Sequence, residues 1–213
     1  MDEHRNWLSE QKIERAAKAL RKHGFNVLTV ATCDQAREAA LELIEPGAKV
    51  GIAGTVTIRE IGLMDVLAER GNRVVHHWLP GLTSEQEDEL RHEEMFADVF
   101  VCSSNAVTVT GELVNIDGTG NRVVSMIYGP RKIILIAGSN KIVPDVSAGI
   151  WRARNVAAAL NAHRGNYDSP CGKIGYCTDC DSPGRICRVV SIIERRPSRS
   201  DVTVILVAEE VGF

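Results

Sequence analysis

Long uncharged apolar stretches are missing from this sequence of 213 residues. No segment approaches the roughly 18 to 20 consecutive apolar residues that cross a bilayer, so we expect no membrane span. Residues 1–7 carry acidic and basic side chains where a secretion signal would have a basic segment followed by an apolar run. These two observations predict a cytoplasmic protein.

A large charge of one sign is missing as well. Lys and Arg number 25 against 28 Asp and Glu, which gives a formal net charge of −3. This balance argues against a polybasic nucleic-acid binder, and an apolar content of 44% argues against a disordered chain. The arginine-rich stretch 185–199 is too short to change this conclusion. We do not expect a nucleic-acid partner, and RNA binding through a zinc knuckle with this basic flank is the weaker alternative.

The signatures of several enzyme classes are also missing. The sequence holds no P-loop, no GxGxxG turn, no zinc-protease motif and no Ser/His/Asp pattern. Its histidines give little indication of catalysis, because His76 and His77 end a predicted strand and His92 lies in a highly charged segment. We therefore expect these three side chains to be non-catalytic.

Helical periodicity alternates with short apolar runs over the first 170 residues, which is typical of a layered α/β fold. The expected helices lie near residues 13–23, 36–43, 57–70, 84–95 and 145–162. The expected strands are residues 26–31, 49–53, 73–78, 98–102, 106–110, 113–117, 132–137 and 202–208. Gly111-Glu112 separates two of these runs as a hairpin turn would, so we expect a mixed sheet. The length suits one domain over residues 1–213.

Four of the six cysteines are concentrated between residues 168 and 188, just before the last predicted strands. Cys171, Cys177, Cys180 and Cys187 have the spacing C-x5-C-x2-C-x6-C. A C-x2-C pair lets two thiolates hold one metal, and the glycines beside it let the outer cysteines fold back. Free or disulfide-linked cysteines are the alternative, and a reducing cytosol disfavours the disulfides. We predict a metal-binding knuckle over residues 168–188.

The metal in this knuckle is either a 4Fe-4S cluster or zinc, since tetrahedral thiolate sets suit both. Structural zinc sites usually pair two short knuckles across a longer spacer, whereas this segment has one C-x2-C pair. We therefore favour the 4Fe-4S cluster over zinc.

A small-residue turn joins an early strand to the helix that follows it. The turn contains Gly54, Thr55 and Thr57, and Thr57 stands three residues before Glu60, as in a capping box. Free N–H groups and hydroxyls at such a turn can bind an anion, and its place after a strand favours a ligand site. A capped turn without ligand is the alternative.

A second small-residue segment follows the predicted hairpin. In the strand 113–117, alternation puts Asn115 and Asp117 on one face, and we expect them to share a cleft with Glu112 as catalytic side chains. The candidate ligand-binding residues after the strand are Gly118, Thr119, Gly120 and Asn121. The alternative is an ordinary turn in which Asp117 accepts hydrogen bonds from the backbone of Thr119 or Gly120.

Several segments together resemble the lactate-utilisation (LUD) domain family over nearly the whole chain. They are Gly-Glu-Leu-Val-Asn-Ile-Asp-Gly-Thr-Gly-Asn-Arg (111–122), Gly-Pro-Arg-Lys (129–132), Asn-Lys-Ile-Val (140–143) and the cysteine segment. The early turn departs from the family pattern, since Ala53-Gly54-Thr55 replaces a Gly-Gly-Ser or Gly-Asn-Ser turn. The resemblance implies a mainly parallel open sheet with helices on both faces, similar to the sugar-phosphate isomerase and CoA-transferase superfamily.

The resemblance also implies a role in oxidising L-lactate or a related 2-hydroxy acid beside iron–sulfur partner subunits. The alternatives are a CoA-transferase-like or isomerase-like enzyme acting on a small anionic ligand, and a binding module with a structural zinc knuckle. Fold analogy alone supports the enzyme reading. The sequence is also compatible with a homo-oligomer.

Overall fold

The computed structural model describes residues 3–213, and its central element is a six-stranded sheet in which every pairing is parallel. The strand order is β1-β10-β7-β4-β2-β3. The strands are β1 (Asn26–Val30), β2 (Lys49–Ile52), β3 (Arg73–Val75), β4 (Val99–Cys102), β7 (Lys132–Gly138) and β10 (Asp201–Val207). The mainly parallel α/β fold expected from the sequence is confirmed.

Four further strands form a separate sheet in the order β8-β5-β6-β9. They are β5 (Ala106–Thr108), β6 (Leu113–Asp117), β8 (Ile142–Val143) and β9 (Val189–Ile193). The antiparallel β5–β6 hairpin is present as expected, but the prediction of one mixed sheet is wrong. After β4 the chain turns out of the main sheet, where the Ser104 hydroxyl donates to the carbonyl oxygens of Ala106 and Val114. The sequence analysis did not predict β9. It considered only the arginines of the stretch 185–199 and not the apolar run Val189–Ile193 within it.

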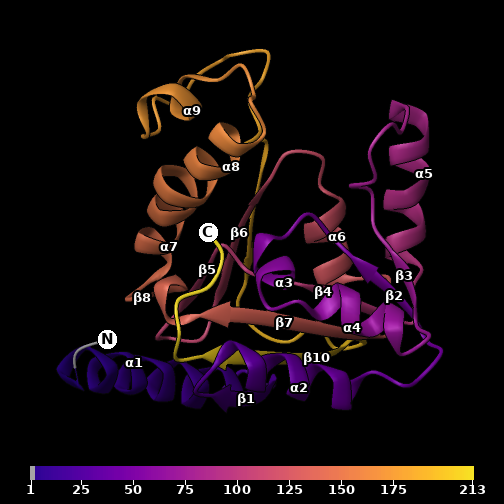
Figure 1. The fold of residues 1–213 in the computed structure, drawn as a ribbon. Coiled ribbons are helices and arrows are strands. Elements are labelled where there is room, and N and C mark those ends of the chain that lie inside the picture. Colours follow the sequence, from indigo (N-terminus) through magenta and orange to yellow (C-terminus); the bar gives the residue numbers. More distant parts are fainter. Residues whose placement is uncertain (1–2) are drawn as a thin grey trace.

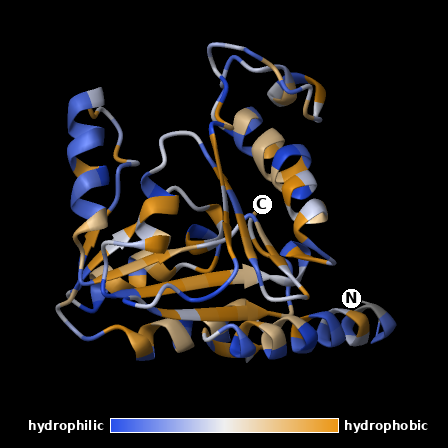
Figure 2. Ribbon diagram, turned by 180° about the vertical axis from the view of Figure 1, so that it is seen from behind, coloured by the Kyte–Doolittle hydropathy of each residue, from blue (hydrophilic) through white to orange (hydrophobic). Residues whose placement is uncertain are grey.

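Helices cover both faces of the main sheet, as expected. Side chains of α1 and α6 pack with Ile133 and Leu135 of β7, whereas those of α2, α3 and α4 pack with Ile134 and Ile136 on the opposite face. Figure 2 shows the strands of the main sheet as largely hydrophobic and α5 as largely hydrophilic. The helices are α1 (Glu3–Lys22), α2 (Cys33–Leu43), α3 (Val56–Glu60), α4 (Leu63–Glu69), α5 (Ser84–Met95), α6 (Asn121–Ile127), α7 (Val146–Arg152), α8 (Ala158–Arg164) and α9 (Pro170–Ile174).

Two helix predictions need correction. The single helix expected over residues 57–70 is two helices, because Gly62 between them has φ 66°, a left-handed conformation that glycine adopts without strain. The capping box expected at Thr57 and Glu60 is absent from the described residues. Thr55 is the N-cap of α3, and the Thr57 hydroxyl instead accepts a hydrogen bond from Lys141.

The two sheets and their helices give the molecule two raised sides (Figure 1). The helices α7, α8 and α9 rise on one side together with β6, and α5 rises on the other. A π-helical turn over residues 153–157 joins α7 to α8. No helix within the described residues is long and apolar enough to cross a membrane.

Candidate functional site

A cavity of about 660 Å³ lies at the carboxyl ends of β2, β3 and β4, between the two raised sides. In the sheet, β3 lies beside β2 on one side. The later strands β4 and β7 lie on the other side of β2, so the direction in which strands are added reverses at β2. Open parallel sheets bind ligands where the strand order reverses in this way. The β6 end, the start of α6, the 153–164 helical face and residues 185–188 complete the wall.

Most of the predicted site residues border this one cavity. Those in its wall are Gly54, Thr55, Thr57, Asp117, Gly118, Thr119 and Asn121. The early glycine turn and the central polar segment, more than 50 positions apart in the sequence, thus face each other across one space. Gly120, Asn115 and Glu112 are not among the lining residues.

Glu112 and Asn115 have other roles. Glu112 lies in the β5–β6 turn, where its carboxylate accepts hydrogen bonds from the hydroxyls of Thr108 and Thr110. The expectation that Glu112 shares a cleft with Asp117 is wrong, because the two residues stand at opposite ends of β6. Asn115 is fully buried beneath the cavity, and its Oδ1 accepts from Arg122 Nη1 at 2.6 Å.

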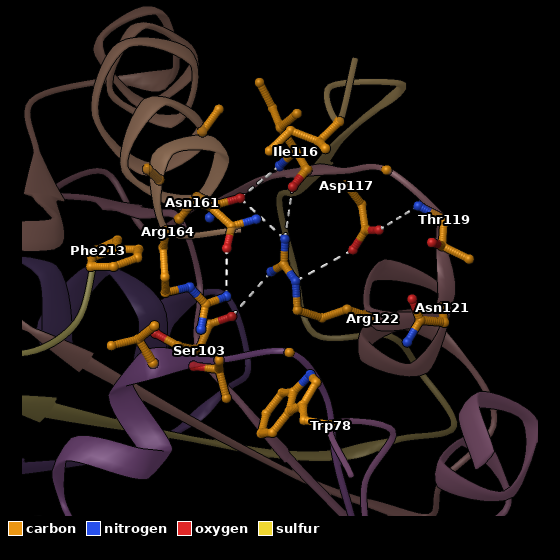
Figure 3. Close-up of a pocket in the computed structure, with 18 of the residues that line it drawn as sticks. Trp78, Ser103, Ile116, Asp117, Thr119, Asn121, Arg122, Asn161, Arg164 and Phe213 are labelled. Carbon is orange, nitrogen blue, oxygen red and sulfur yellow. Dashed lines mark hydrogen bonds and ion pairs between the residues drawn. The ribbon is translucent and has the colours of Figure 1, made fainter. Parts of the chain in front are cut away.

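The Arg122 guanidinium is held in place by the protein itself (Figure 3). It donates to the carbonyl oxygens of Ser103 and Ile116 at 3.2 and 2.8 Å. Its Nε lies 3.4 Å from Asp117 Oδ2. Asp117 Oδ1 accepts from the backbone N–H groups of Thr119 and Gly120 at 3.1 and 2.8 Å, as the turn interpretation predicted. Arg122 and Asp117 therefore form a buried pair that shapes the cavity wall.

Lys141 is a buried wall residue that the sequence analysis did not select. It follows β7, and its Nζ donates to Thr57 Oγ1 at 2.7 Å and to Ser103 Oγ at 2.9 Å. Burial, together with the nearby charges of Arg152 and Arg122, lowers the pKa of Lys141 to about 7. The only sequence signal was its place in the Asn-Lys segment of the family resemblance.

An imidazole oriented by a carboxylate lies in the wall after β3. His77 Nδ1 is 2.6 Å from Oε1 of Glu94, whose side chain is 1% exposed. Burial raises the pKa of Glu94, and the contact with His77 opposes this shift. The sequence analysis expected His77 to be non-catalytic, but the structure places it in the cavity wall. A carboxylate that fixes an imidazole in this way is a common arrangement for proton transfer.

The mouth of the cavity carries several arginines, which differ in whether a carboxylate neutralises them. Arg91 pairs with Glu87 at 2.8 Å, and Arg185 pairs with Asp179 at 2.9 Å. Arg164 donates to the Asn161 side chain and Arg188 to a main-chain carbonyl. Within residues 3–213 the structure gives Arg164 and Arg188 no ion-pair partner. The wall thus presents uncompensated positive charge.

An indole forms another part of the wall. Trp78 follows β3 and lies over Gly54, where an added Cβ would meet Trp78 Nε1 at 3.4 Å. The guanidinium of Arg59 stacks on the indole ring, 4.0 Å from its centroid. Figure 3 shows Trp78 on the side of the cavity opposite Ile116.

The cysteine knuckle forms the adjoining wall. Arg185, Ile186 and Arg188 line the cavity. Gly118 permits the close approach of the knuckle, since a Cβ there would stand 3.0 Å from the Ile186 carbonyl oxygen. The knuckle and the β6 end are therefore packed against each other.

The cysteines of the knuckle are free thiols. The Asp179 N–H donates to Cys177 Sγ at 3.4 Å, and the Ser169 hydroxyl lies 3.5 Å from Cys171 Sγ. Burial raises the pKa of Cys187, and the nearby thiols of the other three cysteines act in the same direction. The four cysteines are thus close enough to interact, although the described residues contain no group of three metal-ligating side chains that could hold a metal ion.

Comparison with known proteins is consistent with this architecture. No curated protein matches the chain. The structure is similar to a crystal structure of a DUF162 family protein from Deinococcus radiodurans, with a TM-score of 0.53 and 14% sequence identity over 93% of this chain and 98% of that one. At this identity the likeness shows the fold. The family model of the LUD domain matches residues 13–207. This chain therefore belongs to the LUD domain family.

Proposed function

We propose that this protein binds a small organic anion in the cavity and serves the oxidation of L-lactate or a related 2-hydroxy acid in the cytoplasm. The observation that carries the proposal is the uncompensated charge of Arg164 and Arg188 at the cavity mouth. A guanidinium binds carboxylate and phosphate through paired N–H donors. The membership of the LUD family supports the metabolic role.

The distribution of charge favours an anion over a neutral ligand. Arg91, Arg122, Lys141, Arg164, Arg185 and Arg188 line the cavity, and the side-chain carboxylates among its lining residues are Glu87 and Asp117. Both carboxylates already contact an arginine of the wall. A bound carboxylate or phosphate would supply the missing negative charge, and cation-lined clefts concentrate such ligands.

The knuckle is proposed to hold a metal, with a 4Fe-4S cluster favoured over zinc. The donor chemistry supports this proposal, because four thiols lie in one loop and the Asp179 N–H donates to Cys177 Sγ, although in the described residues three of these thiols do not converge on one point. Arg185 steadies the loop by donating to the carbonyl oxygens of Cys180 and Cys187. A bound cluster supplies one-electron transfer to iron–sulfur partner subunits, whereas zinc supplies structural support.

A second candidate is an enzyme of CoA-transferase-like or isomerase-like type acting on the same anion. The observation that favours it is the His77–Glu94 pair in the cavity wall, because such a pair can carry a proton to or from a bound ligand. Both candidates use the same anion site. They differ because the second requires the isolated chain to catalyse a reaction on the bound anion.

Thermal-shift measurements with L-lactate, inorganic phosphate, a sugar phosphate and an acyl-CoA test the proposal. We expect at least one anion to raise the melting temperature of the wild type and to have little effect on the double variant R164Q/R188Q. The control R15Q removes an arginine exposed on α1, far along the chain from the cavity wall, and should respond as the wild type does. Equal shifts in R164Q/R188Q and R15Q would contradict the assignment of the anion site. A turnover assay on the isolated chain then separates the two candidates.

A further inference from the structure

The Lys141 amine is placed at the meeting point of three parallel strands. Lys141 follows the end of β7, while its two hydroxyl partners, Thr57 and Ser103, follow the ends of β2 and β4. Lys141 is buried, with 2% of the residue exposed, yet it lines the cavity. A buried amine at the floor of an anion site is a candidate for chemistry as well as for binding.

The hydrogen bonds of this amine suit its uncharged form. An ammonium has three N–H donors, and the two hydroxyls accept from two of them. A neutral amine has two N–H donors and a lone pair, so the same hydroxyls satisfy both donors and leave the lone pair available. Such a lone pair makes the nitrogen a nucleophile.

On balance, the charged groups that face Lys141 from the neighbouring helices and strand also favour the uncharged amine. Arg152 of α7 and Arg122 of α6 disfavour the ammonium, and burial disfavours it more strongly. Glu60 of α3 and Cys102 of β4 act in the opposite direction without restoring the ordinary pKa. Near neutral pH a far larger fraction of the Lys141 amines is therefore uncharged than in an ordinary lysine, for which the fraction is roughly one in 2,500.

We propose that Lys141 captures the carbonyl group of an anionic aldehyde or ketone as a Schiff base, an inference that rests on the anion site proposed above. The nitrogen attacks the carbonyl carbon, an N–C bond forms, and the carbonyl π electrons move to oxygen. Two protons pass from nitrogen to that oxygen through the hydroxyls of Thr57 and Ser103. The C–O bond then breaks, water leaves and a C=N bond remains, so the step consumes no oxidant or reductant.

The same cavity explains why the carbonyl compound should be anionic. Arg164 and Arg188 bind the carboxylate or phosphate, which holds the carbonyl carbon in the cavity that Lys141 lines. A neutral carbonyl compound lacks this anchor. The ligand class is therefore a carbonyl compound with a carboxylate or phosphate group.

Reductive trapping tests the proposal. The intact protein is incubated with pyruvate, glyoxylate or glyceraldehyde phosphate and with cyanoborohydride, which reduces an imine to a stable secondary amine, and the modified lysine is identified by peptide mass spectrometry. We expect Lys141 to be labelled far more than the exposed Lys18 of α1. Labelling should rise with pH through about 7, and acetone should label Lys141 weakly.

The variants make each outcome decisive. K141R should lose the labelling, K18M should retain it, and S103A should slow it. Labelling confined to surface lysines of the wild type would overturn the proposal, and this mapping does not depend on whether K141R folds. Anions that stabilise the protein without labelling Lys141 would refute the Schiff base and leave the anion site standing. Labelling of Lys141 that R164Q/R188Q does not reduce would instead contradict the anion site.

Discussion

The backbone N–H of Arg188 donates to the carbonyl oxygen of Asp117 at 2.9 Å, and this bond joins the cysteine knuckle to the strand that borders the cavity. One residue before Arg188 is Cys187, a proposed metal ligand, and Arg188 itself lines the cavity. The knuckle therefore cannot change its fold without moving a wall of the anion site. Metal content and anion affinity should consequently change together.

The first prediction concerns this link. C180S should lower the iron and acid-labile sulfide content of anaerobically prepared protein, and it should weaken anion binding about tenfold, the effect of losing one charged hydrogen bond of about 1.5 kcal/mol at the mouth. Cys33 lies outside the knuckle, in α2, so C33S is the matched control and should keep both properties. Full metal content in C180S and in C177S would defeat the metal assignment, and unchanged anion affinity in a metal-free C180S would defeat the link.

The second prediction concerns the buried pair of Arg122 and Asp117. R122M removes a guanidinium that contacts Asn115, Asp117 and two main-chain carbonyls, so the free energy of unfolding should fall by about 3–5 kcal/mol. D117N keeps the oxygen that accepts from Thr119 and Gly120, so its cost should be smaller, about 1–2 kcal/mol. Denaturant unfolding measures both values.

Anion binding by the same D117N variant distinguishes the two roles considered for Asp117. Because the substitution removes a negative charge beside Arg122, the affinity for an anion should stay the same or rise. A carboxylate that contacts the ligand or transfers a proton would instead lose binding or turnover when changed to the amide. A large loss of affinity in a folded D117N variant would show that Asp117 acts on the ligand directly.

The third prediction is a pH dependence of stability that arises from Lys141. The pKa of Lys141 is about 7 in the folded protein, against an ordinary value of 10.5. Below pH 7 the folded state bears the full cost of burying the ammonium. Between these two values the folded chain has released a proton that the unfolded chain still holds. The free energy of unfolding should therefore rise with pH over this window, by at most roughly 1.4 kcal/mol per pH unit.

Comparison with K141M isolates this contribution from those of other titrating groups. The wild type should gain stability relative to K141M between about pH 6 and about pH 9. The matched control K18M removes an exposed lysine of α1, and its difference from the wild type should change with pH much less than that of K141M. A constant difference for K141M would mean that Lys141 keeps an ordinary pKa.

The sequence predicted much of the main sheet because its strands are short apolar runs set between helices with clear periodicity. It also selected the Gly54–Thr57 turn and Asp117 as candidate site residues, since each lies at the end of a predicted strand, and the structure brings them to one cavity. It failed for Glu112, because this residue precedes β6 at the end remote from Asp117, and alternation places it on the opposite face from Asp117. At about 3.3 Å per residue, Glu112 and Asp117 lie roughly 16 Å apart along the strand.

Lys141 and His77 escaped the sequence analysis for a different reason. The partners of Lys141 stand 84 and 38 positions away in the sequence, and the partner of His77 stands 17 positions away. A lysine after a strand or a histidine at a strand end is ordinary until the order of the strands is known. The parallel order β7-β4-β2-β3 brings these residues to one edge of the sheet.

The most direct test of the anion site is isothermal titration of the wild type and of R164Q/R188Q with the anion that gives the largest thermal shift, at low and at high ionic strength. The account predicts binding to the wild type that weakens as salt rises, because the arginines at the mouth are partly solvated. It also predicts an affinity at least about tenfold lower for the double variant, since each lost charged hydrogen bond costs about 1.5–3 kcal/mol. Equal affinities of the two proteins, unaffected by salt, would contradict it.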